Sequence, residues 1–112
     1  MPHRLLVSLI LSIASCAWAT PPTQMLEIPV RGTIGADVTI EGLEQALQLA
    51  ETGPSNGVVV LIDSLGGDLE TGRELARRLG ACAVPKIAVV REAGGAALPV
   101  LFACDRWVVN PS

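Results

Sequence analysis

Two glycine pairs stand where apolar runs typical of buried strands give way to helical patterns. Gly66 and Gly67 follow VVVLIDSL, and Gly94 and Gly95 follow KIAVVREA. Glycines at such junctions leave backbone N–H groups free to face an anion or a polarised carbonyl oxygen. The same residues also suit a tight turn that needs a positive φ angle. The residues alone keep both interpretations open.

Side chains suited to catalysis or metal binding are few. The chain has one histidine, His3, and one lysine, Lys86, which falls in a predicted strand and is interpreted as an edge or snorkelling residue. Asp63 and Asp68 flank the first glycine pair, and capping of the next helix accounts for Asp68. Neither G-x-G-x-x-G nor G-K-[ST] occurs. We therefore predict no cofactor and no metal.

The pattern of the rest of the chain predicts alternating strands and helices. Strands are expected at 25–32, 58–63, 86–90 and 106–110, and helices at 39–51, 69–81 and 96–104. Short connections between such elements require right-handed crossovers and a parallel sheet. We expect a single α/β domain, since 112 residues suffice for only one.

The charge balance and the N-terminus limit the partners. The net charge is −3 with no basic cluster beyond Arg77 and Arg78, which argues against nucleic-acid binding. Residues 1–19 read as a signal peptide that ends in AWA, so we expect export to a bacterial periplasm or cell envelope. Residues 20–25 form a short linker and 26–112 the domain. The alternative is a lipoprotein anchored through Cys16, the only case that implies a membrane.

Two cysteines remain after export. An oxidising compartment permits a disulfide between Cys82 and Cys104, which would contribute roughly 3 kcal/mol by closing a loop. Two buried thiols at helix ends are the other interpretation, because free cysteine packs as a small apolar residue. Sequence does not decide between them. The pair is too isolated to indicate zinc.

Several motifs together resemble a known fold. IDSLGGDLETG, PKIAVV and FACDRWVVNPS, in this order, resemble the Clp protease/crotonase-like superfold, and most closely its signal-peptide-peptidase A and NfeD-type serine proteases. The resemblance covers residues 26–112 and implies a parallel sheet with βαβ crossovers. Such proteases usually continue past the last strand, so the chain is expected to be a truncated or minimal form. Leu65 replaces the proline usual in their glycine loop.

The resemblance also assigns site positions. It implies that the N–H groups of Gly67 and Ala96 act as the two oxyanion-type donors. It places the serine nucleophile at Gly95, so we assign no catalytic residue. Pro99 suits the first turn of a helix, which puts the helix start at 95–97. Ser55, Ser64 and Ser112 have no evident partner.

These observations favour a non-catalytic, exported Clp protease-like domain. It would bind a peptide or a partner chain, or contribute to an envelope assembly, and self-association is expected. The alternative is a degenerate or fragmentary serine peptidase whose base comes from missing sequence or another subunit, because activation of a hydroxyl needs a base within hydrogen-bond reach. A crotonase-like acyl-CoA enzyme is disfavoured by export.

Overall fold

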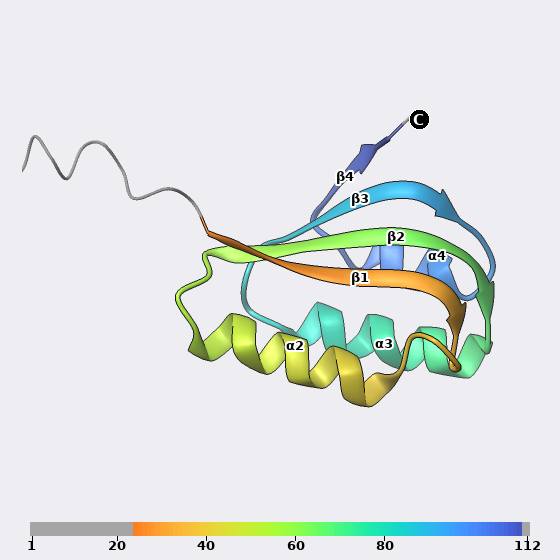
Figure 1. Cartoon of the computed structure of the whole chain (residues 1–112), viewed down its shortest axis with the longest axis horizontal. Coiled ribbons are helices and arrows are strands. Elements are labelled where there is room, and N and C mark those ends of the chain that lie inside the picture. Colours follow the sequence, from red (N-terminus) through yellow and green to blue (C-terminus); the bar gives the residue numbers. More distant parts are fainter. Residues whose placement is uncertain (1–23, 111–112) are drawn as a thin grey trace, which may run out of the picture.

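The computed structural model describes residues 24–110 of the chain (Figure 1). The elements in order are β1 (Met25–Ile34), α2 (Ile40–Thr52), β2 (Gly57–Gly67), α3 (Leu69–Ala81), β3 (Lys86–Ala93), α4 (Ala97–Phe102) and β4 (Arg106–Val109). The expected alternation of strands and helices is confirmed. The signal-peptide residues 1–19, with His3 and Cys16, most of the linker and Ser112 lie outside the described residues. Met25, assigned to the linker, already belongs to β1.

The strands form one parallel sheet in the order β1-β2-β3-β4. This confirms the parallel arrangement predicted from the connections. β1 and β4 are the edges, so Pro29 lies on an edge strand, where a missing N–H is tolerated. The carboxyl ends of β2 and β3 lead into the two glycine pairs, which therefore share one end of the sheet.

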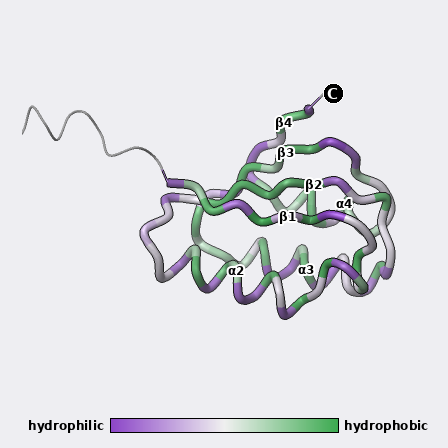
Figure 2. Tube along the Cα trace, viewed as in Figure 1, coloured by the Kyte–Doolittle hydropathy of each residue, from purple (hydrophilic) through white to green (hydrophobic). Residues whose placement is uncertain are grey.

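All three helices cover the same face of the sheet. A cavity of about 210 Å³ is lined by Val30 and Val60 from the sheet and by Leu43, Leu75 and Val100 from α2, α3 and α4. The buried strand residues alternate along β1, β2 and β3, as expected for a sheet covered on one face. Figure 2 shows the hydrophobic residues along the strands and their periodic recurrence in α2 and α3.

Both long helices begin at side-chain caps. The Thr39 hydroxyl oxygen accepts a hydrogen bond from the Gly42 N–H at 3.1 Å, and Asp68 accepts one from the Thr71 N–H at 2.9 Å. The hydroxyl of Thr71 also donates to Asp68, and this side-chain hydrogen bond is the main cause that lowers the pKa of the carboxyl. The capping role expected of Asp68 is confirmed.

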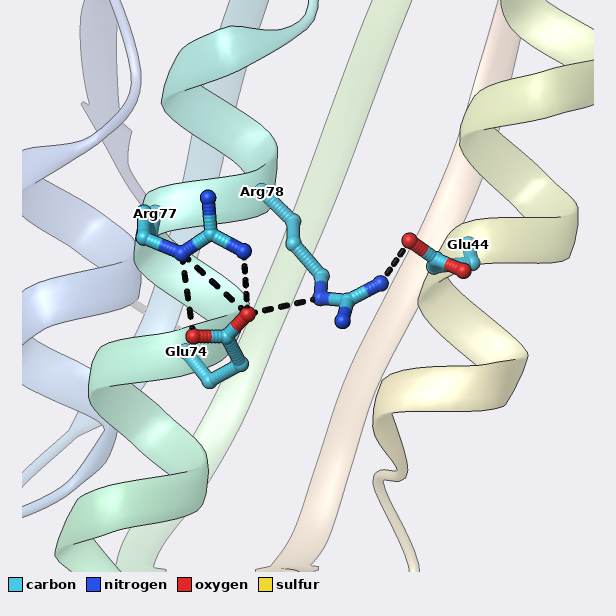
Figure 3. Close-up of polar contacts among 4 residues, drawn as sticks. All are labelled: Glu44, Glu74, Arg77 and Arg78. Atoms are coloured by element: carbon cyan, nitrogen blue, oxygen red, sulfur yellow. Dashed lines mark hydrogen bonds and ion pairs between the residues drawn. The ribbon is translucent and has the colours of Figure 1, made fainter.

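An ion-pair network joins α2 to α3 (Figure 3). Arg78 contacts Glu74 one turn earlier on α3, at 2.9 Å, and reaches across to Glu44 on α2. Arg77 binds the same Glu74 carboxylate, and this hydrogen bond lowers the pKa of Glu74. The basic pair that stood out in the sequence therefore serves the packing of two helices.

Several element boundaries differ from the sequence prediction, since β1 continues to Ile34 and β3 to Ala93, and the largest differences are at β2 and α4. β2 continues through the glycine pair to Gly67, because Thr33 and Ile34 of β1 resume pairing with it after a register shift. α4 ends at Phe102, earlier than the predicted residue 104. The N–H of Asp105 donates to the Lys86 carbonyl at 2.8 Å, which draws the chain into the sheet and ends the helix. Among residues 24–110, no helix is long and apolar enough to cross a bilayer.

Candidate functional site

The two glycine turns contact each other at the carboxyl ends of β2 and β3. A side-chain carbon added to Gly66 would lie 3.1 Å from the Ala96 nitrogen and 3.1 Å from the Gly94 carbonyl oxygen. The Gly94 N–H donates to the Ser64 carbonyl at 3.0 Å. Gly66, with φ at 117°, therefore leaves a small space directly against residues 94–96. The motifs alone indicated two junctions, the resemblance implied that both contribute donors to one site, and the fold brings the two turns into contact.

Gly67 has a different neighbour. It pairs with Ile34 of β1, and a side-chain carbon at this position would overlap the Ile34 carbonyl oxygen. Its φ of 150° favours glycine as well. Gly66 is thus the glycine that contacts the second turn. The assignment of the Gly67 N–H as a donor to a ligand stays a prediction.

Ser64 fixes the shape of the glycine turn. Its buried hydroxyl donates to the Gly32 carbonyl at 2.6 Å and accepts from the Gly66 N–H at 3.1 Å. Sequence reasoning found no partner for this serine, because its partners are backbone groups. The available signal was its place in the alternation of inward-facing residues, after Val60 and Ile62. Ser64 is a positioning residue of the turn.

The second glycine turn contains the Ala96 N–H group, which follows Gly95, a residue without a side chain. Gly95 has φ at 49°, and α4 follows with Pro99 as its third residue, as predicted. The Ala97 and Leu98 N–H groups donate to Gly94 and Gly95. Within the described chain the Ala96 N–H has no acceptor, although Ala96 is only 2% exposed. A buried N–H without a partner is costly and is normally paired.

Three exposed leucines lie next to the glycine turns along the chain. Leu65 is 75% exposed, Leu69 is 45% exposed and Leu98 is 38% exposed. The first two flank Gly66 and Gly67 along the chain, and Leu98 follows Ala96 within α4. Exposed apolar side chains grouped around one polar feature are typical of binding sites.

The described residues do not assemble a catalytic base beside Gly95. Lys86 lies at the opposite end of β3, roughly 23 Å along the strand from Ala93 at about 3.3 Å per residue. Its interpretation as an edge residue is wrong: it is buried at 5% exposure, and its ammonium donates to the Cys82 and Val84 carbonyls at 2.8 and 3.0 Å. These carbonyls lie at and just after the C-terminus of α3, where the partial negative charge of the helix dipole favours a cation. Asp63 lies near the glycine turn, on the sheet face away from the helices.

Cys82 and Cys104 are free thiols, and both are buried. Of the two interpretations left open by the sequence, the structure has the unbonded one. The Cys104 thiol donates to the Val100 carbonyl at 3.6 Å, and burial raises its pKa to about 11, with Lys86 opposing this shift and Asp105 adding to it. Residues 24–110 contain no group of three side chains suited to hold a metal ion.

Comparison with known proteins identifies the fold. No family model matches the sequence, and no curated protein matches it significantly. Among solved structures, a variant of the 1510-N membrane-bound stomatin-specific protease in complex with a substrate peptide superposes with a TM-score of 0.67 at 14% identity. A variant of ClpP1 from Listeria monocytogenes superposes with a TM-score of 0.63 at 17% identity. The chain has a Clp protease-like fold.

The likeness covers 78% of this chain in both superpositions. It covers 41% of the stomatin-specific protease and 57% of ClpP1, so the chain spans about half the length of these structures. The resemblance stated from the motifs is confirmed at the level of the Clp protease/crotonase-like fold. At these identities the superpositions establish the fold alone, and the roles of Gly67, Gly95 and Ala96 stay predictions.

Proposed function

We propose that this chain is an exported, non-catalytic Clp protease-like domain that holds an apolar peptide segment at its glycine turns. The observation that carries the proposal is the Ala96 N–H, which lies on a buried residue, beside Gly66, without an acceptor in the described chain. A peptide carbonyl or terminal carboxylate would supply the missing acceptor. The three leucines around the turns would contact apolar side chains of the same segment.

The residues favour binding over hydrolysis. Gly95 at the expected nucleophile position has no hydroxyl, and the sequence has no histidine besides His3. The Lys86 ammonium is engaged by two carbonyls at the far end of β3, and the Ser64 hydroxyl is engaged within the glycine turn. Activation of a serine needs a base within hydrogen-bond reach, which these groups do not provide.

Two observations support an apolar peptide as the ligand. The stomatin-specific protease of similar fold was captured with a substrate peptide, which makes a peptide a reasonable ligand class for this chain. The leucine surroundings favour an apolar peptide. Export rests on the signal-peptide pattern of residues 1–19, with the lipoprotein alternative through Cys16, and both remain proposals.

The binding part of the proposal is tested with a fluorescein-labelled Leu-Val-Leu-Val peptide that has a free carboxylate. We expect saturable binding to the full chain by fluorescence polarisation. Gly66→Ala should weaken it at least about tenfold, because the added carbon occupies the space beside the Ala96 nitrogen. Gly80→Ala is the matched control, since a carbon there meets nothing within 4 Å. Equal affinity of wild type and Gly66→Ala, with both folded by circular dichroism, would refute the site.

The non-catalytic part is tested separately with a fluorophosphonate probe and by mass spectrometry of the same peptide. We expect no labelled serine and an intact peptide after prolonged incubation. Specific labelling of any serine, or cleavage that co-purifies with the wild-type chain, would favour a peptidase with a base from elsewhere.

A further inference from the structure

The sheet face away from the helices is largely apolar and carries ordered rows of side chains. Residues paired across parallel strands lie side by side on one face, so the registers define these rows. The first row is Glu27, Val59, Ile87 and Arg106. The second row is Pro29, Leu61, Val89 and Val108. We call these eight residues the open face.

No described element covers the open face. The helices all lie on the opposite side, where the cavity lining joins α2, α3 and α4 to the inward-facing strand residues. None of the open-face residues belongs to the core cluster or packs against it. Val108 is 53% exposed. Apolar surface of this kind on a small domain marks an interaction site.

The two charges of the open face lie at opposite edges of one row. Glu27 is on the edge strand β1, and Arg106 is on the other edge strand, β4. Neither side chain takes part in an ion pair within residues 24–110. The interior of the row between them is uncharged.

We propose that the open face binds a second copy of this chain, related by a two-fold axis that runs parallel to the strands. This operation places β1 of one copy opposite β4 of the other and β2 opposite β3. Glu27 then faces Arg106 of the other copy, twice in the dimer. Apolar residues face apolar ones: Val59 opposite Ile87, Leu61 opposite Val89, and Pro29 opposite Val108.

The alternative two-fold axis, across the strands, matches poorly. It places each strand opposite its own copy, so Glu27 meets Pro29 or Arg31 and Arg106 meets Val108. In the register that pairs Glu27 with Pro29, Glu27 and Arg106 are both buried against apolar residues. In the register that pairs Glu27 with Arg31, Asp63 meets Val59 and Glu92 meets Ile87, so charges again lie against apolar surface, which is costly. In the parallel arrangement the next row, with Arg31, Asp63 and Glu92, lies at the rim. Asp63 of one copy faces Glu92 of the other there, and both carboxylates stay in water.

The size of the open face sets the strength of the dimer. Four strands enclose three spacings of about 4.8 Å, and five residues along a strand measure about 3.3 Å each. The flat area of the open face is therefore roughly 250 Å² per copy. Stable interfaces bury about 800 Å² per partner. We therefore expect a weak, reversible dimer with a Kd on the order of 100 µM.

The decisive experiment is a charge swap followed by sedimentation equilibrium of the full chain. We expect wild type to dimerise with rising concentration, and Glu27→Arg and Arg106→Glu each to weaken dimerisation at least about fivefold, because each puts like charges together twice. The double variant should recover wild-type affinity. Failure of the double variant to recover would overturn this arrangement, as would a wild type that stays monomeric up to about 1 mM.

Apolar variants test the same face without relying on charge. Leu61→Glu and Val108→Glu should abolish the dimer. Leu49→Glu is the control and should leave the dimer intact, because Leu49 lies on α2 and is 62% exposed. Val108 is exposed at the edge, so its substitution leaves the core intact if Leu61→Glu fails to fold. A dimer that survives Val108→Glu would show that the N-terminal residues or another surface mediates association. Peptide binding at the glycine turns should be unchanged in the charge-swap variants, so the two proposals fail independently.

Discussion

At Gly95 the backbone has a φ of 49°, a value that L-residues adopt at a modest cost. An added side-chain carbon would first meet the Leu65 carbonyl oxygen at 3.4 Å, which is ordinary contact. The position therefore has room for a serine that the sequence does not place there. In the proposed function, the absence of a hydroxyl at Gly95 and of a base beside it among residues 24–110 together account for the lack of hydrolysis.

We predict that Gly95→Ser folds, loses about 1 kcal/mol of stability, and does not become a peptidase. The new hydroxyl would lack a base, so fluorophosphonate labelling should stay at the wild-type level. Gly80→Ser, at an open helix position, is the control for an exposed serine. Strong, site-specific labelling of Gly95→Ser alone would show that a base is present.

Cys104 makes stability depend on pH in the alkaline range. Burial raises the pKa of its thiol to about 11, above the ordinary value of 9.0. At a pH below 9.0 the Cys104 thiol keeps its proton in both the folded and the unfolded chain. The stability that the buried, protonated thiol gives the folded chain is then fully present. Between the two values the unfolded chain releases a proton that the folded chain retains, so stability falls as the pH rises.

We therefore predict that wild type loses on the order of 1–2 kcal/mol more than Cys104→Ala between about pH 8 and pH 10.5. Urea unfolding of both proteins at both pH values measures the difference, since other titrating groups are common to the two. Parallel losses in the two proteins would contradict the raised pKa.

The sequence predicted single residues unevenly. Asp68 as a cap and Pro99 in a first helical turn follow from local backbone requirements, and both are confirmed. Ser64 and Lys86 were misjudged, because the partners of both are backbone carbonyls or N–H groups brought close by the fold. Local patterns do not contain that information.

At the scale of elements, the strand and helix types follow from periodicity, and the boundaries depend on partners. β2 runs on to Gly67 because the end of β1 pairs with it. α4 ends early because Asp105 binds the Lys86 backbone. The meeting of the two glycine turns was implied only by the family resemblance, since it depends on β2 and β3 being neighbours, which local patterns do not show.

The contact between α2 and α3 gives a prediction at this scale. Arg78 bridges Glu44 and Glu74, so Arg78→Met and Glu44→Gln should show a favourable coupling free energy in a double-mutant cycle (Figure 3). The coupling should shrink when salt is raised from about 10 mM to 1 M, because partly exposed pairs are screened. The Arg73 and Glu70 pair, which lies within α3, is the control for an ion pair that joins no elements. Coupling that is absent at low salt would contradict the bridge.

At the scale of the whole molecule, residues 24–110 form a Clp protease-like sheet whose described helices all lie on one face, and the chain spans about half the length of the similar solved structures. The fold class was predictable because the motif order and the alternating elements agree. The open face was not, because it depends on which strand residues point away from the helices and on the register between strands. Its apolar rows are the whole-molecule basis for the proposed self-association.

The central claim is that the glycine turns bind a peptide carbonyl or carboxylate without cleaving the peptide. The most direct test is a ¹H–¹⁵N NMR titration of the full chain with unlabelled Leu-Val-Leu-Val. We predict that the Ala96 amide shows one of the largest, saturable shifts, with Gly66 and Leu98 nearby also shifting and Gly80 unmoved, and that the peptide stays intact. An Ala96 amide that does not shift at saturating peptide, or a peptide cleaved during the titration, would contradict the account.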